Sequence, residues 1–281
     1  MKLSSIITEL EFNGQKLRIR YPAVMGILNA TPDSFSDGGR HLGTQKAIER
    51  IKQMLDEGAQ IIDVGGESTR PGSNPVSMDE ELKRVLPILE ALPKDDFVIS
   101  VDTTKPEVAE ASLKAGAHIV NDVSGGENPN LIDLAEQHGS GYVLMHTKGS
   151  PKTMQDSPTY EDVVAEVKAF MDEKTILLAA RRLPRFWMDP GIGFGKTLEH
   201  NLSLMGNLSA FHDERRGLLL GASRKSWIDR LCGATDPSRR LGGSIAAAIE
   251  ATRQGVEIIR SHDVGETVQA LQAADAIVGS S

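Results

Sequence analysis

The sequence contains almost no cysteine: Cys232 is the single one among 281 residues. One cysteine cannot form an internal disulfide or a cysteine-rich zinc site, which favours a reducing compartment. Long apolar runs are also missing, since none approaches the roughly 18–20 residues that cross a bilayer. The first residues lack the apolar core of a secretory signal peptide. We therefore expect a cytoplasmic protein that makes no contact with a membrane.

An excess of positive charge is absent as well. The chain carries 31 Lys and Arg against 39 Asp and Glu, which gives a formal net charge of −8. This balance argues against a broad surface for nucleic acid. It does not exclude a small anionic substrate, because a few arginine and lysine side chains can converge in one cleft.

What the sequence does contain is a short apolar strand followed by a helix, a unit that occurs eight times. The strands are continuous apolar runs, as expected when both faces of a sheet are covered. Eight such units in about 250 residues predict a (β/α)8 barrel, the TIM-barrel fold, as a single domain over residues 1–281. A doubly wound open sheet is the alternative.

Two local patterns precede the second strand of this series. Polar and apolar residues alternate over 6–21 around Asn13-Gly14, which predicts a short N-terminal β-hairpin. Thr44 is a favourable N-cap residue, and Gly58 follows an amphipathic run. We therefore expect the first helix to run from Thr44 to Glu57. Later in the chain, we expect further helices over about 199–211 and 237–253.

Every predicted strand delivers a polar or charged side chain near its end. These residues are Asn29, Asp63, Asp102, Asn121, His146, Asp189, Ser223 with Lys225, and Arg260 with His262. The carboxyl ends of the strands form the active-site face of a TIM barrel. Polar residues can also simply mark where buried strands stop, but carboxylates within apolar surroundings need partners. The pattern therefore favours a converged site.

The residue types indicate which ligand the site would take. Acceptor-rich side chains suit a flat heterocycle with N–H and amino donors: Asp63, Asp102, Asn121 and Asp189. Cations and N–H donors suit a phosphate: Arg70, Lys225, Arg260 and His262.

The glycine-rich segment 189–197 ends in Gly-Lys-Thr, as a phosphate-binding P-loop does. A P-loop also requires glycine at position 190, where this chain has proline. The dinucleotide fingerprint fails too, because Lys196 stands where its third glycine belongs. We therefore expect no nucleotide here and interpret the glycines as sites of tight turns and close backbone approach.

Several segments together resemble one enzyme family. Residues 25–39, MGILNATPDSFSDGG, closely resemble the first signature of dihydropteroate synthases, and residues 62–72, IDVGGESTRPG, resemble the second. Further matches follow in the family's order at 100–103, 121–125, 145–146, 189–197, 223–225 and 260–264. The family pattern is not followed at Ala30, Thr147 and Ser261, none of which is a proposed ligand.

The resemblance implies a reaction. The enzyme would condense 6-hydroxymethyl-7,8-dihydropterin diphosphate with 4-aminobenzoate, giving 7,8-dihydropteroate and pyrophosphate. It also implies Mg²⁺ on the diphosphate, bound through Asn29, and a homodimer formed by the last helices. Sulfonamides, as mimics of aminobenzoate, would compete at the loop that contains residues 69–71.

The resemblance further implies roles for individual residues. The pterin ring would be held by Asp102, Asn121, Asp189 and Lys225, with Asp63 beside them. The diphosphate would be held by Arg70, Arg260 and His262. Aminobenzoate would be framed by Thr69, Pro71, Phe194 and Ser223. The catalytic set would be Asp37, Asp102, Lys225 and Arg260, with Asp37 and Phe35 on a loop that closes over the site.

Two other functions stay open at this point. One is a pterin-binding methyltransferase barrel, which would share the pterin pocket but would not need the anion-binding residues. The other is a paralogue that binds pterin without catalysis, which should have lost a loop residue or a cation. The anion-binding residues at 69–71, Arg260 and His262 argue against the first, and the presence of Asn29, Asp37, Arg70, Lys225 and Arg260 argues against the second.

Overall fold

The computed structural model describes residues 6–30, 39–68, 73–94, 96–149, 154–155 and 157–279, with the side chains of helix α1 described from residue 43 onward. Within these ranges, parallel strands form a closed barrel in the order β10-β3-β4-β5-β6-β7-β8-β9. The prediction of a (β/α)8 barrel is confirmed, and the open sheet is excluded. None of the described helices is long and apolar enough to cross a bilayer.

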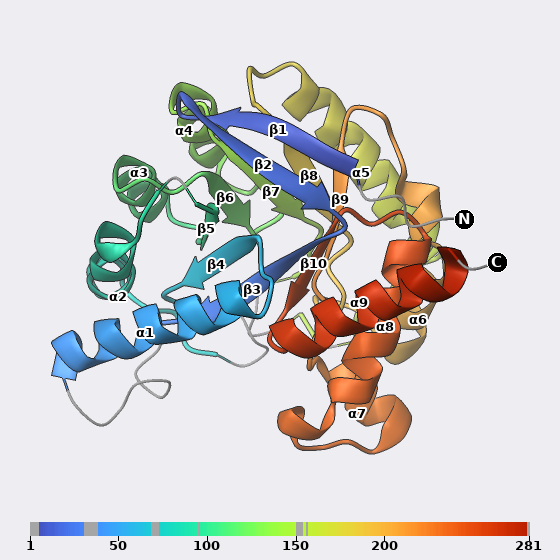
Figure 1. Ribbon diagram of the computed structural model, residues 1–281. Helices are drawn as coiled ribbons and strands as arrows, with labels where there is room; N and C mark the ends of the chain where they lie inside the picture. The colour runs from blue at the N-terminus through green and yellow to red at the C-terminus, as the bar shows by residue number, and fades with distance from the viewer. Residues whose placement is uncertain are drawn as a thin grey trace.

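Helices surround the barrel strands on the outside (Figure 1). The barrel strands are β3 (Ala23–Asn29), β4 (Ile61–Gly65), β5 (Val98–Asp102), β6 (Ile119–Asp122), β7 (Gly141–Met145), β8 (Phe186–Asp189), β9 (Gly217–Leu220) and β10 (Ile258–Ser261). The α-helices are α1 (Gly39–Asp56), α2 (Met78–Ala91), α3 (Pro106–Lys114), α4 (Pro129–Gln137), α5 (Val163–Ala179), α6 (Leu198–Gly206), α7 (Ser226–Cys232), α8 (Leu241–Arg253) and α9 (Val264–Gly279).

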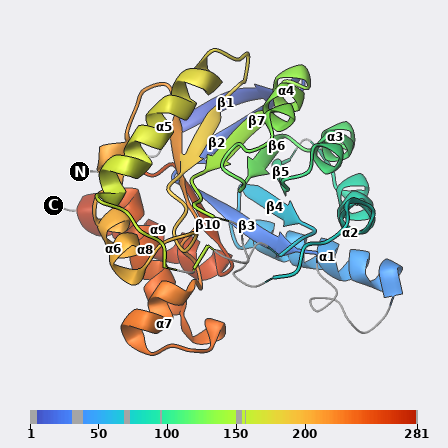
Figure 2. The same ribbon diagram turned by 180° about the vertical axis from the view of Figure 1, so that it is seen from behind.

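The N-terminal hairpin is confirmed. Strand β1 (Ile6–Phe12) pairs antiparallel with β2 (Gln15–Tyr21), and the turn residues Asn13 and Gly14 have φ angles of 49° and 77°. These positive angles suit the tight hairpin turn that Asn-Gly favours. The hairpin lies across one end of the barrel, and it appears behind the barrel strands in Figure 2. Its apolar residues pack there against the first residues of the strands.

The two-residue period of a strand decides which side chains enter the barrel. In β4, Ile62 and Val64 belong to the core between the strands and the helices, whereas Ile61 belongs to the core inside the barrel. Asp63 shares the inward row with Ile61. The same period holds for the other strands, so apolar residues fill the hairpin end of the barrel and polar residues occupy its mouth.

Two helix predictions need correction. Helix α1 begins at Gly39, so Thr44 lies inside it and the predicted N-cap is wrong. Residues 40–42 can all adopt helical angles, and glycine at position 43 lowers the stability of the helix by only about 1 kcal/mol relative to alanine. The expected helix over 237–253 is a 3₁₀ turn (Pro237–Arg239) followed by α8. Arg240 separates the two, because its buried guanidinium donates to the carbonyls of Ala234 and Arg224.

The expected helix over 199–211 is also divided. Helix α6 ends at Gly206, and a 3₁₀ turn follows from Leu208 to Phe211. The Asn207 side chain donates back to the Ser203 carbonyl at 2.8 Å. This local hydrogen bond serves a carbonyl at the helix end, where the last turn otherwise leaves its acceptors without partners.

Candidate active site

Arg260 on β10 is the electrostatic centre of the barrel mouth. Its Nε donates to Asp63 Oδ2 at 2.6 Å, and its Nη2 donates to Asp102 Oδ2 at 2.8 Å. Asn121 Nδ2 also donates to Asp63 Oδ2, at 3.0 Å. The side chains of Asp63, Asp102 and Asn121 are buried. The guanidinium therefore offsets carboxylate charge that burial would otherwise make costly.

The second oxygen of each carboxylate points to a ligand. Asp63 Oδ1 and Asp102 Oδ1 are buried, and no group among the described residues donates a hydrogen bond to either. Most buried acceptors in proteins have a donor, and leaving one without a donor costs about 1–3 kcal/mol. Two such oxygens in one cluster indicate a place for a molecule that brings its own N–H groups.

Asp189 extends this surface from β8. It is buried, and its Oδ1 accepts from the Gly191 amide at 2.7 Å. Gly221 leaves space beside it: a Cβ added there would lie 3.5 Å from Asp189 Oδ2, 3.8 Å from Lys225 Nζ and 3.9 Å from Arg260 Cδ. The glycine thus keeps the space between one carboxylate and two cations open.

Burial shifts two pKa values toward neutrality. Burial chiefly, and the nearby Asp63, Glu81 and Asp122 in addition, raise the pKa of Asp102 to about 7, although Arg260 opposes the rise. Burial lowers the pKa of Lys225 to about 8, and Arg260 lowers it further, against the effect of Asp189. Small changes in charge near these groups will therefore alter the protonation of the site.

Lys225 and Phe194 meet at the glycine-rich segment. Lys225 Nζ donates to the Ile192 carbonyl at 2.6 Å and lies 4.5 Å from the centroid of the Phe194 ring. The aromatic face attracts the ammonium. Lys225, which is predicted to bind the pterin, and Phe194, which is predicted to contact aminobenzoate, are therefore adjacent.

Ser223 and His262 form a second pair at the mouth. His262 Nδ1 lies 3.1 Å from Ser223 Oγ, and the His262 amide donates to the same oxygen at 3.2 Å. Ser261, one of the departures from the family pattern, has its hydroxyl 2.9 Å from that of Thr267 and accepts from the Asp263 amide. Ser261 therefore stabilises the start of α9 and does not face the site.

Sequence reasoning missed Lys196. This lysine is only 1% exposed, its Nζ donates to the Phe194 carbonyl at 2.9 Å, and it lies 2.9 Å from His146 Nδ1. Burial lowers the pKa of Lys196 to about 7 and that of His146 to about 3. The sequence feature that could have indicated this role is the lysine itself, which follows a Gly-Phe-Gly segment that matches neither nucleotide-binding motif.

The predicted close backbone approach of the glycines is confirmed. Gly191 has a φ of 69°, and a Cβ added there would lie 1.8 Å from the His146 carbonyl oxygen. The segment is thus packed directly on the end of β7. This contact fixes the amide that Asp189 accepts from.

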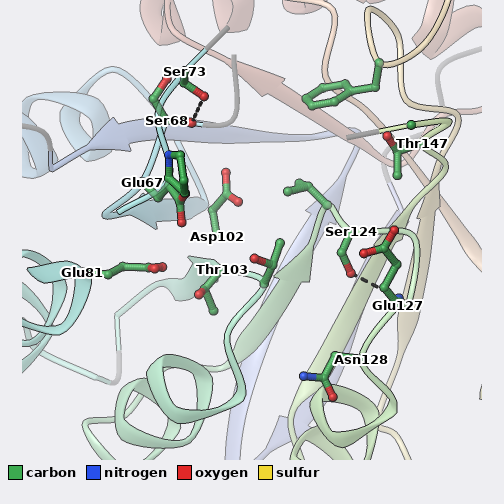
Figure 3. Close-up of a pocket in the computed structure, with 15 residues that line it drawn as sticks. Glu67, Ser68, Ser73, Glu81, Asp102, Thr103, Ser124, Glu127, Asn128 and Thr147 are labelled. Carbon is green, nitrogen blue, oxygen red and sulfur yellow. Dashed lines mark hydrogen bonds between the residues drawn. The ribbon is translucent and has the colours of Figure 1, made fainter. Parts of the chain in front are cut away.

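A cavity of about 590 Å³ opens beside Asp102. Figure 3 shows Asp102 between Glu67 and Glu81 on one side and Ser124 on the other. Thr147, another departure from the family pattern, also lines it. Sequence reasoning singled out neither Glu67 nor Glu81, because their position follows only from how α2 packs on the end of β4.

The structure brings together most of the predicted site. Asp63, Asp102, Asn121, Asp189, Lys225 and Arg260 converge on the mouth, with Phe194, Ser223 and His262 at its rim and Asn29, half-buried, at the end of β3. Asp37, Thr69, Arg70 and Pro71 lie outside the described residues, as does Phe35, so their roles stay predictions.

Comparisons with known proteins agree on one family. A family model described as "Pterin binding enzyme" matches residues 25–262. A dihydropteroate synthase of Escherichia coli (strain K12) is 48% identical over 270 residues, covering 95% of both chains. The structure of Yersinia pestis dihydropteroate synthase with a sulfonamide drug has a TM-score of 0.87 at 43% identity, covering 97% of this chain and 100% of that one. Xanthomonas albilineans dihydropteroate synthase in complex with 7,8-dihydropteroate has a TM-score of 0.85 at 38% identity, covering 96% of this chain and 99% of that one.

Proposed function

Because the chain belongs to the dihydropteroate synthase family, and thus condenses 6-hydroxymethyl-7,8-dihydropterin diphosphate with 4-aminobenzoate, we propose that the barrel mouth around Arg260 binds the pterin. The observation that carries this is the pair of buried oxygens, Asp63 Oδ1 and Asp102 Oδ1, for which no described residue supplies a donor. The amino group and ring N–H groups of a pterin would supply those donors. Asn121 and Asp189 would complete the polar rim around the ring.

Arg260 has a second task in this proposal. A guanidinium carries five N–H groups, and the Nε and Nη2 bonds to Asp63 and Asp102 leave others for a diphosphate oxygen. Lys225, beside Asp189, would carry charge toward the same substrate. His262 lies at the rim, where it would meet the diphosphate together with Arg70.

The residues present fit a magnesium ion carried in with the diphosphate. No group of three or more His, Cys, Asp or Glu among the described residues could hold a metal alone. Mg²⁺ commonly binds through one or two protein ligands together with substrate phosphates and water. Asn29 would supply the protein oxygen. When bound, the ion would draw charge from the leaving diphosphate.

The chain's own groups then suit a reaction through a pterin methylene cation. The carbon–oxygen bond to the diphosphate breaks and leaves a positive charge on the methylene carbon. The nearby Asp102 carboxylate would stabilise that charge. The neutral aryl amine attacks that carbon, and the resulting ammonium is acidic enough to lose its proton to the released pyrophosphate. No strong general base is needed, so the site works by charge stabilisation and by excluding water.

Two properties of the whole protein belong to the same proposal. We place it in the cytoplasm, in keeping with its single cysteine. We also propose a homodimer through the last helices, as the family resemblance implies; on α9, Ile277 is 69% exposed. Sedimentation velocity tests the dimer, and a monomer at micromolar concentration would contradict it.

The function is tested by pyrophosphate release from the dihydropterin diphosphate. We expect release and dihydropteroate formation only when 4-aminobenzoate and Mg²⁺ are both present, and we expect a sulfonamide to compete with 4-aminobenzoate. The products are measured by a coupled phosphate assay and by mass spectrometry. Release that does not depend on aminobenzoate, with no pteroate formed, would contradict the proposed function.

A further inference from the structure

Lys105 joins two carboxylates beside the candidate active site. Its side chain is 23% exposed, and its ammonium donates to both Glu67 and Glu81. Glu67 follows β4, Glu81 lies in the first turns of α2, and Lys105 precedes α3. The Glu67 side chain is 19% exposed and that of Glu81 is fully buried. Three elements of the barrel are thereby connected through one cation.

Further hydrogen bonds hold the described residues on both sides of residues 69–72. Glu67 Oε1 accepts from the Val76 amide at 3.1 Å, so its carboxylate spans the two ends of this segment. Arg84 Nη1 donates to the Gly66 carbonyl at 2.8 Å. Gly66 itself lies so close to α2 that an added Cβ would be 2.8 Å from Glu81 Cγ. The start of the segment is therefore held from several sides.

The cluster also borders the reaction site. Glu67 and Glu81 line the 590 Å³ cavity together with Asp102 and Phe194, and Figure 3 shows both glutamates on one side of Asp102. Glu81 is near enough to contribute to the raised pKa of Asp102.

Stability alone does not account for these contacts. Replacing a buried ion pair by apolar residues is often neutral or stabilising, so such a pair is weak evidence for a role in stability. The fully buried Glu81 keeps one oxygen, Oε1, to which no described group donates. A cluster that is costly to bury and borders the active site points to a role in the reaction.

We propose that Lys105 is a positioning residue for the condensation: by joining Glu67 to Glu81, it fixes Glu67 in the wall of the Asp102 cavity, two residues before Thr69, Arg70 and Pro71 in the sequence. The inference rests on the proposed function and on the roles at the diphosphate and aminobenzoate that the family resemblance implies for those three residues. Lys105 touches no substrate in this account and acts through Glu67.

The test compares Lys105→Met with Lys114→Met, a matched control. Lys114 lies on α3 in an exposed pair with Glu110, with side-chain exposures of 62% and 43%. We expect Lys105→Met to raise the KM for aminobenzoate and for the diphosphate substrate about tenfold each, a change of about 1.4 kcal/mol. Binding of 6-hydroxymethylpterin, which lacks the diphosphate, should change less than about twofold. Lys114→Met should leave all three values unchanged.

Further variants separate positioning from folding. Lys105→Arg keeps the charge and should recover most of the lost affinity. Glu67→Gln should reproduce the split between the substrates, and adding Lys105→Met to it should have little further effect, because the two residues act as one unit. If Lys105→Met does not fold, the Glu67→Gln variant carries the test.

Two results would overturn the inference. One is an unchanged KM for both substrates in Lys105→Met, and the other is an equal loss of 6-hydroxymethylpterin binding, which would indicate general damage to the barrel. Both are read against the turnover of the unmodified enzyme. Aminobenzoate-dependent turnover that Lys105→Met leaves intact refutes the positioning role alone, whereas its absence in the unmodified enzyme refutes the proposed function.

Discussion

Arg260 serves two charge requirements from one position, and only part of this was predictable. From the sequence, Arg260 at the end of the last strand was predicted to bind an anion. The two-residue period of β10 directs its side chain into the barrel. The structure adds that the guanidinium binds Asp63 and Asp102. Asp63 lies 197 positions away in the chain, and only closure of the barrel brings the two side chains together.

The pKa shifts at the barrel mouth predict a bell-shaped pH dependence of kcat/KM. The raised pKa of Asp102, about 7, means that its carboxylate is protonated and inactive below that pH. The lowered pKa of Lys225, about 8, means that its ammonium is lost above that pH. We therefore expect kcat/KM to rise as pH increases through about 7 and to fall above about 8.

Variants assign the acidic side of this profile. Asp102→Asn should lower activity and abolish the increase near pH 7. Arg260→Gln should move that increase to higher pH, because Arg260 lowers the pKa of Asp102. Steady-state kinetics from pH 5.5 to 9.5 measure both, at a pH range chosen to span the two values by about 1.5 units. An acidic limb unchanged in Asp102→Asn would exclude Asp102 as its source.

At the scale of elements, the glycine-rich segment shows how a loop can be set by contact with a neighbouring strand. The sequence predicted close backbone approach there, and the structure identifies the partner as the His146 carbonyl. The sequence did not identify Lys196 as a buried residue that stabilises this segment. A lysine is rarely buried, and the residues around its ammonium follow different strands.

Gly191→Ala is expected to damage pterin binding. The new Cβ would lie 1.8 Å from the His146 carbonyl oxygen, and φ is 69°, so the backbone must move and Asp189 loses the Gly191 amide. We expect at least about tenfold weaker binding of 6-hydroxymethylpterin by calorimetry, the equivalent of one hydrogen bond to a charged group.

The control for this substitution is Gly206→Ala at the end of α6. Nothing lies within 4 Å of a Cβ added at Gly206. Alanine also has the higher helix propensity. We expect unchanged pterin affinity in this variant. Equal affinity of Gly191→Ala and the unmodified enzyme would show that the segment does not determine the geometry of Asp189.

Element boundaries were the least predictable part of the fold. Thr44 is a favourable N-cap residue, but residues 39–43 are also helical, so the helix starts at Gly39. The contacts of Lys105 were hidden for a different reason. Glu81 looks like an exposed residue in an acidic helix start, and only the packing of α2 on Gly66 buries it.

The whole molecule separates its stability from its chemistry along the barrel. The hairpin β1–β2 covers the end where Phe12, Ile19 and Trp187 form an apolar core inside the strands. The charged residues gather at the opposite end, where the chain can bind a polar substrate. The strand-and-helix repeat in the sequence predicted this architecture, since eight such units close a barrel and a polar residue lies in or shortly after the last part of every strand.

Two buried carboxylate oxygens, Asp63 Oδ1 and Asp102 Oδ1, lack donors among the described residues, and we propose that the pterin supplies them. The most direct measurement is a crystal structure of the enzyme with 6-hydroxymethylpterin. We predict that pterin N–H groups will lie within about 3.2 Å of both oxygens, with the ring beside Asn121 and Asp189. A pterin bound elsewhere, with both oxygens still lacking donors or served only by water, would contradict the account.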